Sequence, residues 1–312
     1  MNPVVRIGRI DYLNVWPVYY GFDLMGIPHG MTLHTAAPAE LNGMLEEGLL
    51  DISAISAFAY AKNHKDWMLV PDLGIGCDGR VMSVLLVSTC PLEALNGAAL
   101  GLSRESASAA SLLRFFFWKR GLACMLDTRR VRSPEDLEGL TGGLVIGDAA
   151  LCGQWREKFP YVYDLAELWK KDTGLPFVFG LWAVRREAVL QRPDALGQAL
   201  SFLLMSKATG MKAMERICQR AAVEKGLAPE TVKDYFTCLD YGLPPSHIRG
   251  LVHYFHCMEK MGFIDGAPEP VFLNSHAPGL AAMNFSDSER PVIPMQKCLS
   301  GARYQEKAAA GL

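Results

Sequence analysis

Short apolar runs alternate with helical patterns along much of this chain, and several of these runs end in polar residues. The first run, 4–10, is followed by Asp11 and Asn14, and a helical segment begins at Trp16. Comparable apolar runs lie at residues 49–56, 98–102, 143–146 and 177–184. Alternating strands and helices predict an α/β fold with largely parallel sheets. In such sheets, ligands contact polar residues that follow the carboxyl ends of strands.

The order of these segments predicts two lobes between which the chain crosses twice. The turn-forming stretch 91–97 marks a first crossing near residue 95, and the strand at 177–184 leads to a second near residue 185. Lobe 1 would then comprise residues 1–95 and 185–265, and lobe 2 residues 96–184, with a ligand cleft between them. Residues 266–312 are rich in Pro, Ala, Ser and Gly and are expected to form an extended or disordered tail.

The bulk composition excludes several classes of partner. The 312 residues include 31 basic and 33 acidic side chains, with no basic stripe for nucleic acid and no polybasic cluster for a membrane surface. No apolar run is long enough to span a membrane, and the N-terminus lacks the apolar core of a signal peptide. The eight cysteines form no CxxC pair. We therefore expect a cytoplasmic protein with reduced thiols.

No cofactor or metal motif is present in the sequence. It contains no GxxxxGKS/T, GxSxG or HExxH pattern, and the pair His253 and His256 has no third ligand in view. Residues 74–79 match GxGxxG, but a strand-like run at 81–87 follows them instead of a helix. We interpret these glycines as a connection between strands, with Ser83 inside the second strand. The sequence thus predicts a protein that works without a cofactor or a metal.

Small polar side chains at strand ends, helix starts and lobe junctions form the set of candidate ligand contacts. They are Asn14, Ser56, Ser83, Ser106, Ser108, Asp148 and Thr173. Hydroxyl groups and free N–H groups at a helix start bind carboxylates or phosphates, so this set suits a small polar anion. Structural alternatives are a turn for Asn14, helix caps for Ser106 and Asp148, and a backbone bond for Ser83.

Five segments of the sequence match a known family in the same order. They are residues 8–17 (GRIDYLNVWP), 48–56 (GLLDISAIS), 81–86 (VMSVLL), 146–151 (IGDAAL), and 164–165 with 169–177. They resemble the chorismate dehydratases of the futalosine route of menaquinone biosynthesis. The similarity extends from about residue 6 to residue 264 and leaves out the predicted tail. Five segments in register make this resemblance far more specific than one short motif.

The resemblance implies a periplasmic-binding-protein type II fold whose two lobes close on a ligand, in the cytoplasm and without a cofactor. It implies conversion of chorismate to 3-[(1-carboxyvinyl)oxy]benzoate with loss of water. By this resemblance, Asn14 and Ser83 lie at the reacting ring, and Ser106 and Ser108 hold a carboxylate. Ala109 departs from the family, which commonly has a serine there. Further expected substrate contacts are Tyr12, Ser56, Asp148 and Thr173.

The expected chemistry leaves the proton acceptor open. Loss of water removes a proton from the ring carbon that bears the enolpyruvyl ether and releases the neighbouring hydroxyl group, and aromatisation drives the reaction. One hypothesis is that a substrate carboxylate helps to take the proton while Asn14 and Ser83 position it. The competing hypothesis is that Asp148 is the base.

Two other functions stay open at this point. The sister enzyme of the same route, 1,4-dihydroxy-6-naphthoate synthase, resembles this chain, but we expect a histidine where this sequence has Gly147. A non-catalytic cytoplasmic small-anion-binding protein would use the same two-lobed fold. The expected partner is a small molecule, chorismate, with no nucleic acid and no membrane. The oligomeric state is not predicted.

Overall fold

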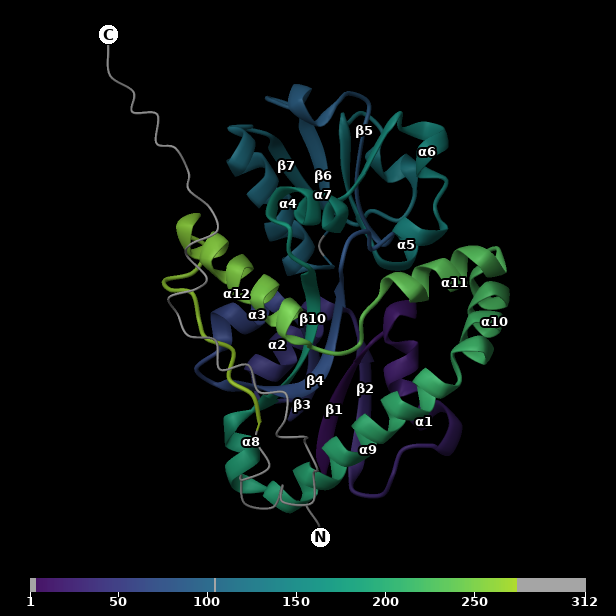
Figure 1. Cartoon of the computed structure of the whole chain (residues 1–312), viewed down its shortest axis with the longest axis vertical. Coiled ribbons are helices and arrows are strands. Elements are labelled where there is room, and N and C mark those ends of the chain that lie inside the picture. Colours follow the sequence, from purple (N-terminus) through teal and green to yellow (C-terminus); the bar gives the residue numbers. More distant parts are fainter. Residues whose placement is uncertain (1–3, 104, 274–312) are drawn as a thin grey trace.

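Two five-stranded sheets form the core of the computed structural model, which describes residues 4–103 and 105–273 (Figure 1). The first sheet has the order β2 (Met31–Ala36), β1 (Val5–Ile10), β3 (Ile52–Ser56), β10 (Phe177–Arg185) and β4 (Trp67–Cys77). The second has the order β7 (Met125–Arg129), β6 (Ala99–Ser103), β8 (Gly142–Ile146), β5 (Val84–Ser88) and β9 (Tyr161–Asp164). We call each sheet, with the helices that pack on it, the first or the second lobe.

Helices surround both sheets. Those of the first lobe are α1 (Trp16–Met25), α2 (Pro38–Glu46), α3 (Ala57–Asn63), α8 (Arg186–Gln191), α9 (Pro193–Lys212) and α12 (Pro245–Lys260). Those of the second lobe are α4 (Ala107–Arg120), α5 (Gly147–Cys152), α6 (Trp155–Lys158) and α7 (Leu165–Thr173). After α9, the chain rises along one side of the molecule through α10 (Met214–Lys225) and α11 (Pro229–Cys238) towards α5 (Figure 1).

The sheets are mixed, so the α/β prediction is confirmed but the expectation of largely parallel sheets is wrong. Strand β1 runs parallel to β2 and β3, and β6 runs parallel to β7 and β8. Strand β10 is antiparallel to both of its neighbours, and so is β5. In both cases the antiparallel strand is the one that follows a crossing from the other lobe. An apolar run has the same pattern in either direction, so the sequence alone does not reveal this.

The chain crosses between the two sheets earlier in the sequence than expected. The chain leaves the first sheet between Cys77 and Val84 and returns between Asp164 and Phe177, whereas crossings were expected near residues 95 and 185. The stretch interpreted as a connection contributes Gly76 to β4 itself. A Cβ atom at this position would lie 2.5 Å from the His247 ring, so only glycine allows this packing.

The last described residues cover one edge of the first sheet. Leu69 of β4 donates its N–H to Val271 O and accepts a hydrogen bond from Leu273 N, both at 2.8 Å. The Leu273 side chain is only 3% exposed. The beginning of the predicted tail is therefore extended and packed against a sheet edge that would otherwise expose unpaired backbone groups. Residues 274–312 of that predicted tail lie outside the described residues.

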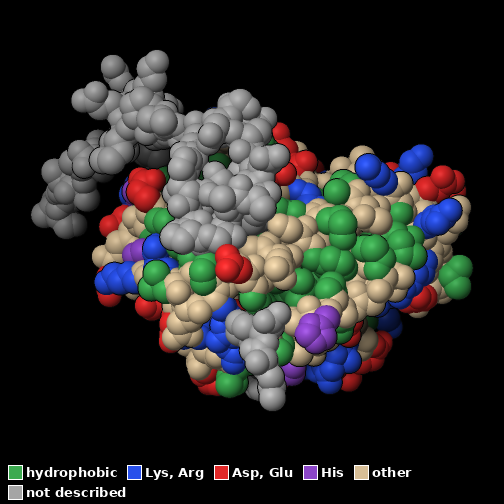
Figure 2. All heavy atoms as spheres, turned by 90° about the horizontal axis from the view of Figure 1, so that it is seen from below, with side chains coloured by type: hydrophobic (Ala, Val, Ile, Leu, Met, Phe, Trp, Pro, Cys, Tyr) green, Lys and Arg blue, Asp and Glu red, His purple; other side chains and the backbone are tan. Residues whose placement is uncertain are grey.

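The surface carries charges of both signs. Seen from below, Lys and Arg side chains alternate with Asp and Glu side chains around areas of hydrophobic and neutral residues (Figure 2). This mixture fits the net charge of −2. Within residues 4–103 and 105–273, no helix has the length and apolar character that crossing a membrane requires.

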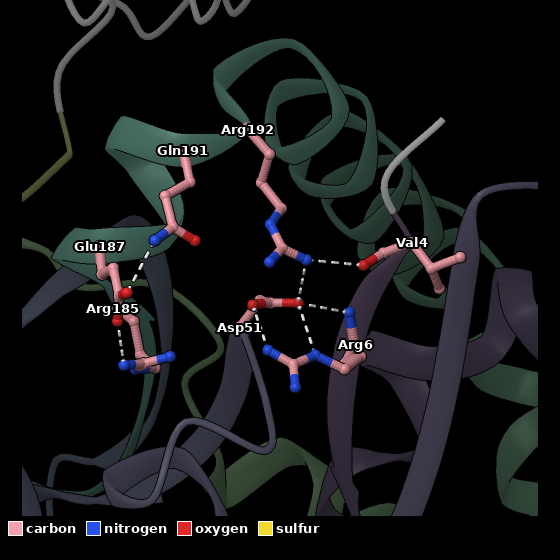
Figure 3. Close-up of polar contacts among 7 residues, drawn as sticks. All are labelled: Val4, Arg6, Asp51, Arg185, Glu187, Gln191 and Arg192. Carbon is pink, nitrogen blue, oxygen red and sulfur yellow. Dashed lines mark hydrogen bonds and ion pairs between the residues drawn. The ribbon is translucent and has the colours of Figure 1, made fainter. Parts of the chain in front are cut away.

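A buried carboxylate ties together three parts of the first lobe. Asp51, which directly precedes β3 and is 1% exposed, accepts hydrogen bonds from Arg6 N at 2.9 Å and from Arg6 Nη2 at 2.8 Å (Figure 3). Arg192, between α8 and α9, lies 3.4 Å from the same carboxylate and also bonds to Val4 O. The hydrogen bond to Asp51 raises the pKa of Arg6. A buried charge of this kind is stable only while its partners remain.

We expect Asp51→Asn to lower the free energy of unfolding by about 3 kcal/mol, because it leaves two arginines facing a neutral group. Chemical denaturation followed by circular dichroism measures this change. The matched control is Asp127→Asn, which breaks an exposed pair with Arg129 and should cost under about 1 kcal/mol. Equal losses in the two variants would contradict the role assigned to Asp51.

Candidate functional site

Asn14 lies in a short 3-10 turn, Leu13–Val15, directly after β1. Leu13 and Val15 are buried and anchor the turn from both sides. The Oδ1 atom of Asn14 is buried and has no hydrogen-bond partner among the described residues. Because a buried carbonyl oxygen without a partner is unfavourable, this atom is an acceptor that a ligand can satisfy.

Ser83 lies just before β5, in the segment that crosses between the lobes, and is 4% exposed. Its carbonyl oxygen accepts a hydrogen bond from Gly147 N at 2.8 Å, and its Oγ accepts one from the Tyr235 hydroxyl at 3.2 Å. The Tyr235 hydroxyl is the donor in this bond, and burial raises the pKa of Tyr235, so the phenol stays protonated. The hydroxyl proton of Ser83 therefore remains available, within the described part of the chain, to donate to a ligand.

The start of α5 brings Asn14 and Ser83 into one region. Gly147, the first residue of this helix, binds the Ser83 carbonyl oxygen, and Asp148 follows it. The Oδ1 atom of Asp148 accepts a hydrogen bond from Leu13 N at 3.0 Å, one residue before Asn14. Because α5 belongs to the second lobe and Leu13 to the first, this bond also joins the two lobes.

The second oxygen of Asp148 forms an ion pair with Lys225. The Oδ2 and Nζ atoms are 2.7 Å apart, and Lys225 is the last residue of α10. Burial lowers the pKa of Lys225, but the hydrogen bond and charge of Asp148 outweigh this effect and raise the pKa above its ordinary value. The lysine also lies 5.8 Å from the centre of the Trp16 ring. Asp148 is thus held from both sides by the first lobe and α10.

Tyr12 provides another contact between the lobes. Its hydroxyl donates a hydrogen bond to Glu105 Oε2 at 2.6 Å. Burial, followed by the bond to Glu105, raises the pKa of Tyr12, so the phenol stays neutral. The predicted site residue Tyr12 therefore lies at the boundary between the lobes, next to the turn that carries Asn14.

The three predicted serines of the helix starts have structural partners. Ser56 Oγ caps α3 by accepting from Ala59 N at 3.0 Å, and Ser106 Oγ caps α4 by accepting from Ala109 N at 3.2 Å. Ser108 is buried, and its Oγ accepts from Phe58 N at 3.1 Å across the lobe boundary. The capping role considered for Ser106 is therefore present. Each oxygen keeps a second lone pair, so capping leaves further hydrogen bonds possible.

Thr173 ends α7, and its hydroxyl is occupied by the backbone. The Oγ1 atom donates to Trp169 O at 2.7 Å and accepts from Leu175 N at 3.1 Å. These bonds shape the return of the chain towards β10, which begins at Phe177. They leave this hydroxyl without a proton to donate to a ligand.

Three contact residues were not predicted from the sequence: Glu105, Lys225 and Tyr235. They contact Tyr12, Asp148 and Ser83, respectively. Each is more than 70 residues away from its partner along the chain, and no local motif marks it. The folded arrangement of α5, α10 and α11 reveals the contacts of Lys225 and Tyr235, and that of the segment before α4 reveals the contact of Glu105.

The fold is similar to that of several solved structures. A protein from Archaeoglobus fulgidus has a TM-score of 0.67 at 17% identity, covering 83% of this chain and 98% of that chain. The alkanesulfonate-binding protein SsuA from Xanthomonas axonopodis pv. citri, bound to MOPS, has a TM-score of 0.59 at 14% identity, with coverages of 87% and 97%. These similarities confirm the predicted periplasmic-binding-protein type II fold.

The sequence has relatives that share more of its residues. A chorismate dehydratase from Thermus thermophilus is 33% identical over 267 residues, covering 80% of this chain and 93% of the relative. A chorismate dehydratase from Campylobacter jejuni is 28% identical over 190 residues, covering 59% of this chain and 70% of the relative. The family described as "Menaquinone biosynthesis" matches residues 5–260. The chain therefore belongs to this menaquinone biosynthesis family.

Proposed function

We propose that this protein is a chorismate dehydratase, a hydro-lyase that converts chorismate to 3-[(1-carboxyvinyl)oxy]benzoate and water in menaquinone biosynthesis. The names of its Thermus and Campylobacter relatives support this proposal. The structural observation that carries it is the buried, unpaired Oδ1 atom of Asn14, in the same region as a serine hydroxyl with a free proton. Together they offer one acceptor and one donor to an uncharged part of a substrate.

The proposed reaction needs orientation and charge stabilisation more than a strong reagent. The C–H bond of the ring carbon that bears the enolpyruvyl ether breaks, and so does the C–OH bond of the neighbouring carbon. The electron pair of the C–H bond completes the aromatic ring, and the removed proton and the hydroxyl group together form water. Ser83 donates a hydrogen bond to a substrate oxygen on which negative charge develops, while Asn14 Oδ1 accepts one from a substrate O–H group. Donors fixed before the reaction stabilise such charge without reorganisation.

We propose that a substrate carboxylate takes the proton. The competing candidate, Asp148, accepts a hydrogen bond from Leu13 N through one carboxylate oxygen and forms an ion pair with Lys225 through the other. A base must lie within hydrogen-bond distance of the proton that it removes from the substrate. The two partners of Asp148 instead fix its carboxylate between the lobes. In this proposal Asp148 joins the lobes around the substrate.

The remaining predicted contacts belong to the proposal as substrate-binding residues. Ser106 lies at the start of α4, where free N–H groups of a 14-residue helix favour a carboxylate. The other residues proposed to contact the substrate are Tyr12, Ser56, Ser108 and Thr173. For Thr173, only the second lone pair of its hydroxyl oxygen would be available to a donor on the substrate.

Gly147 favours the dehydratase over the sister naphthoate synthase, in which we expect a histidine at this position. Gly147 has φ of +63°, and a Cβ atom added to it would lie 3.2 Å from the Tyr12 ring. A histidine here would need a left-handed backbone and a shift of Tyr12.

We also propose a cytoplasmic location and no nucleic-acid partner. The seven cysteines in the described part of the chain are free thiols, as expected in a reducing compartment. A non-catalytic anion-binding protein could share these features, and formation of an aromatic product separates it from the enzyme.

We expect Ser83→Ala to lower kcat/KM for chorismate by about 100- to 1000-fold, because it removes a preorganised donor. The control is Ser88→Ala, which removes a buried serine hydroxyl of β5 that donates to Cys90 O and, among the described residues, has no other side-chain bond. Absorbance of the aromatic product measures both rates. Equal rates in the two variants would rule out the role proposed for Ser83.

Asp148→Asn should raise KM several-fold but keep kcat within about tenfold of the wild type, because the base is elsewhere. Lys225→Met is the companion variant, since it removes the same ion pair and leaves the carboxylate in place. Steady-state kinetics with chorismate measures both. A loss of kcat of about 1000-fold confined to Asp148→Asn would identify Asp148 as the base.

A further inference from the structure

The carboxylate of Asp164 connects two segments of backbone. Asp164 ends β9 and caps α7, and its Oδ1 atom accepts hydrogen bonds from Ala166 N at 3.0 Å and Glu167 N at 3.2 Å. Its Oδ2 atom accepts from Val81 N at 2.9 Å and Met82 N at 2.7 Å. A helix cap needs only the first of these oxygens, so the second serves the segment at 81–82.

That segment has a strained backbone directly before Ser83. Met82 has φ of +62°, and within the described residues only Asp72 shares a positive φ without being glycine. The left-handed conformation costs a residue with a Cβ atom roughly 1–2 kcal/mol and persists only where its surroundings enforce it. The two N–H groups that the Oδ2 atom of Asp164 binds belong to Met82 and to the residue before it.

We infer that Asp164 is a positioning residue for Ser83: its carboxylate holds the 81–82 segment in the left-handed turn that places the Ser83 hydroxyl at the substrate. This inference rests on the proposed function of Ser83. Asp164 forms no hydrogen bond to Ser83, although both residues lie in the described part of the chain, and it acts through Val81 N and Met82 N. The Ser83 carbonyl and hydroxyl oxygens are held separately by Gly147 and Tyr235. The turn at 81–82 therefore sets the direction of the Ser83 side chain.

Asp164→Ser separates this role from helix capping. Serine still caps α7 but is too short to reach residues 81 and 82, so only the cross-segment bonds are lost. We expect kcat for chorismate to fall about 10- to 100-fold with KM nearly unchanged, because the reacting group is displaced while other contacts remain. The control is Asp136→Asn, a carboxylate that binds the N–H groups of Arg132 and Ser133 elsewhere in the second lobe. Its activity should match that of the wild type.

The backbone at position 82 supplies a rescue test. In the Asp164→Ser background, Met82→Gly removes the cost of the left-handed conformation, whereas Met82→Ala removes the same side chain and keeps that cost. We expect kcat to recover at least about fivefold with glycine and not with alanine. Equal kcat in the two double variants, or a folded Asp164→Ser protein with wild-type kcat, would overturn the inference.

Two further measurements keep the test decisive. If Asp164→Ser does not fold, Asp164→Asn replaces it, because one acceptor oxygen remains and the same rescue comparison applies. If the wild type does not turn over chorismate, that result contradicts the proposed function but not the role of Asp164 in holding the 81–82 segment. Amide hydrogen exchange at Met82 then tests the positioning, with faster exchange expected in Asp164→Ser. Unchanged exchange would overturn the inference.

Discussion

The hydrogen bonds made by the first two residues of α5 are the contacts on which the site depends. Gly147 N binds the Ser83 carbonyl oxygen, and Asp148 binds the amide that precedes Asn14. The absence of a Cβ atom at Gly147 lets the Tyr12 ring lie directly against this backbone. Two segments nearly 70 residues apart in the chain are thereby fixed to one short helix.

These contacts are among the hydrogen bonds and ion pairs that hold the two lobes together around the site. Leu13 and Asn14 belong to the first lobe and α5 to the second, so the hydrogen bond from Leu13 N to Asp148 Oδ1 joins the two lobes beside Asn14. The Tyr12–Glu105 and Asp148–Lys225 contacts stabilise the same arrangement. Periplasmic binding proteins close two domains around a ligand. The proposed reaction would use such an arrangement to orient the substrate with groups that closure fixes in place. Asp164 adds a fixed backbone turn to that arrangement.

The sequence predicted the α/β class, and its polar strand ends led to Asn14 and Asp148. The direction of β10 and the sheet of β5 were not predictable, because a buried apolar run does not specify its neighbours. Ser83 was among the polar candidates, and the family resemblance gave its role at the reacting ring. It was expected inside a strand, whereas it lies in the turn before β5. Lys225 and Tyr235 reach the site only through the path of α10 and α11, which local patterns do not encode.

The most direct test of the central claim is incubation of the purified full chain with chorismate, followed by mass and absorbance spectra of the product. The account predicts an aromatic product that has lost one molecule of water, formed without an added metal or coenzyme, with each equivalent of enzyme turning over many equivalents of chorismate. Tight binding of chorismate with no product would contradict the account and identify a binding protein on the same fold.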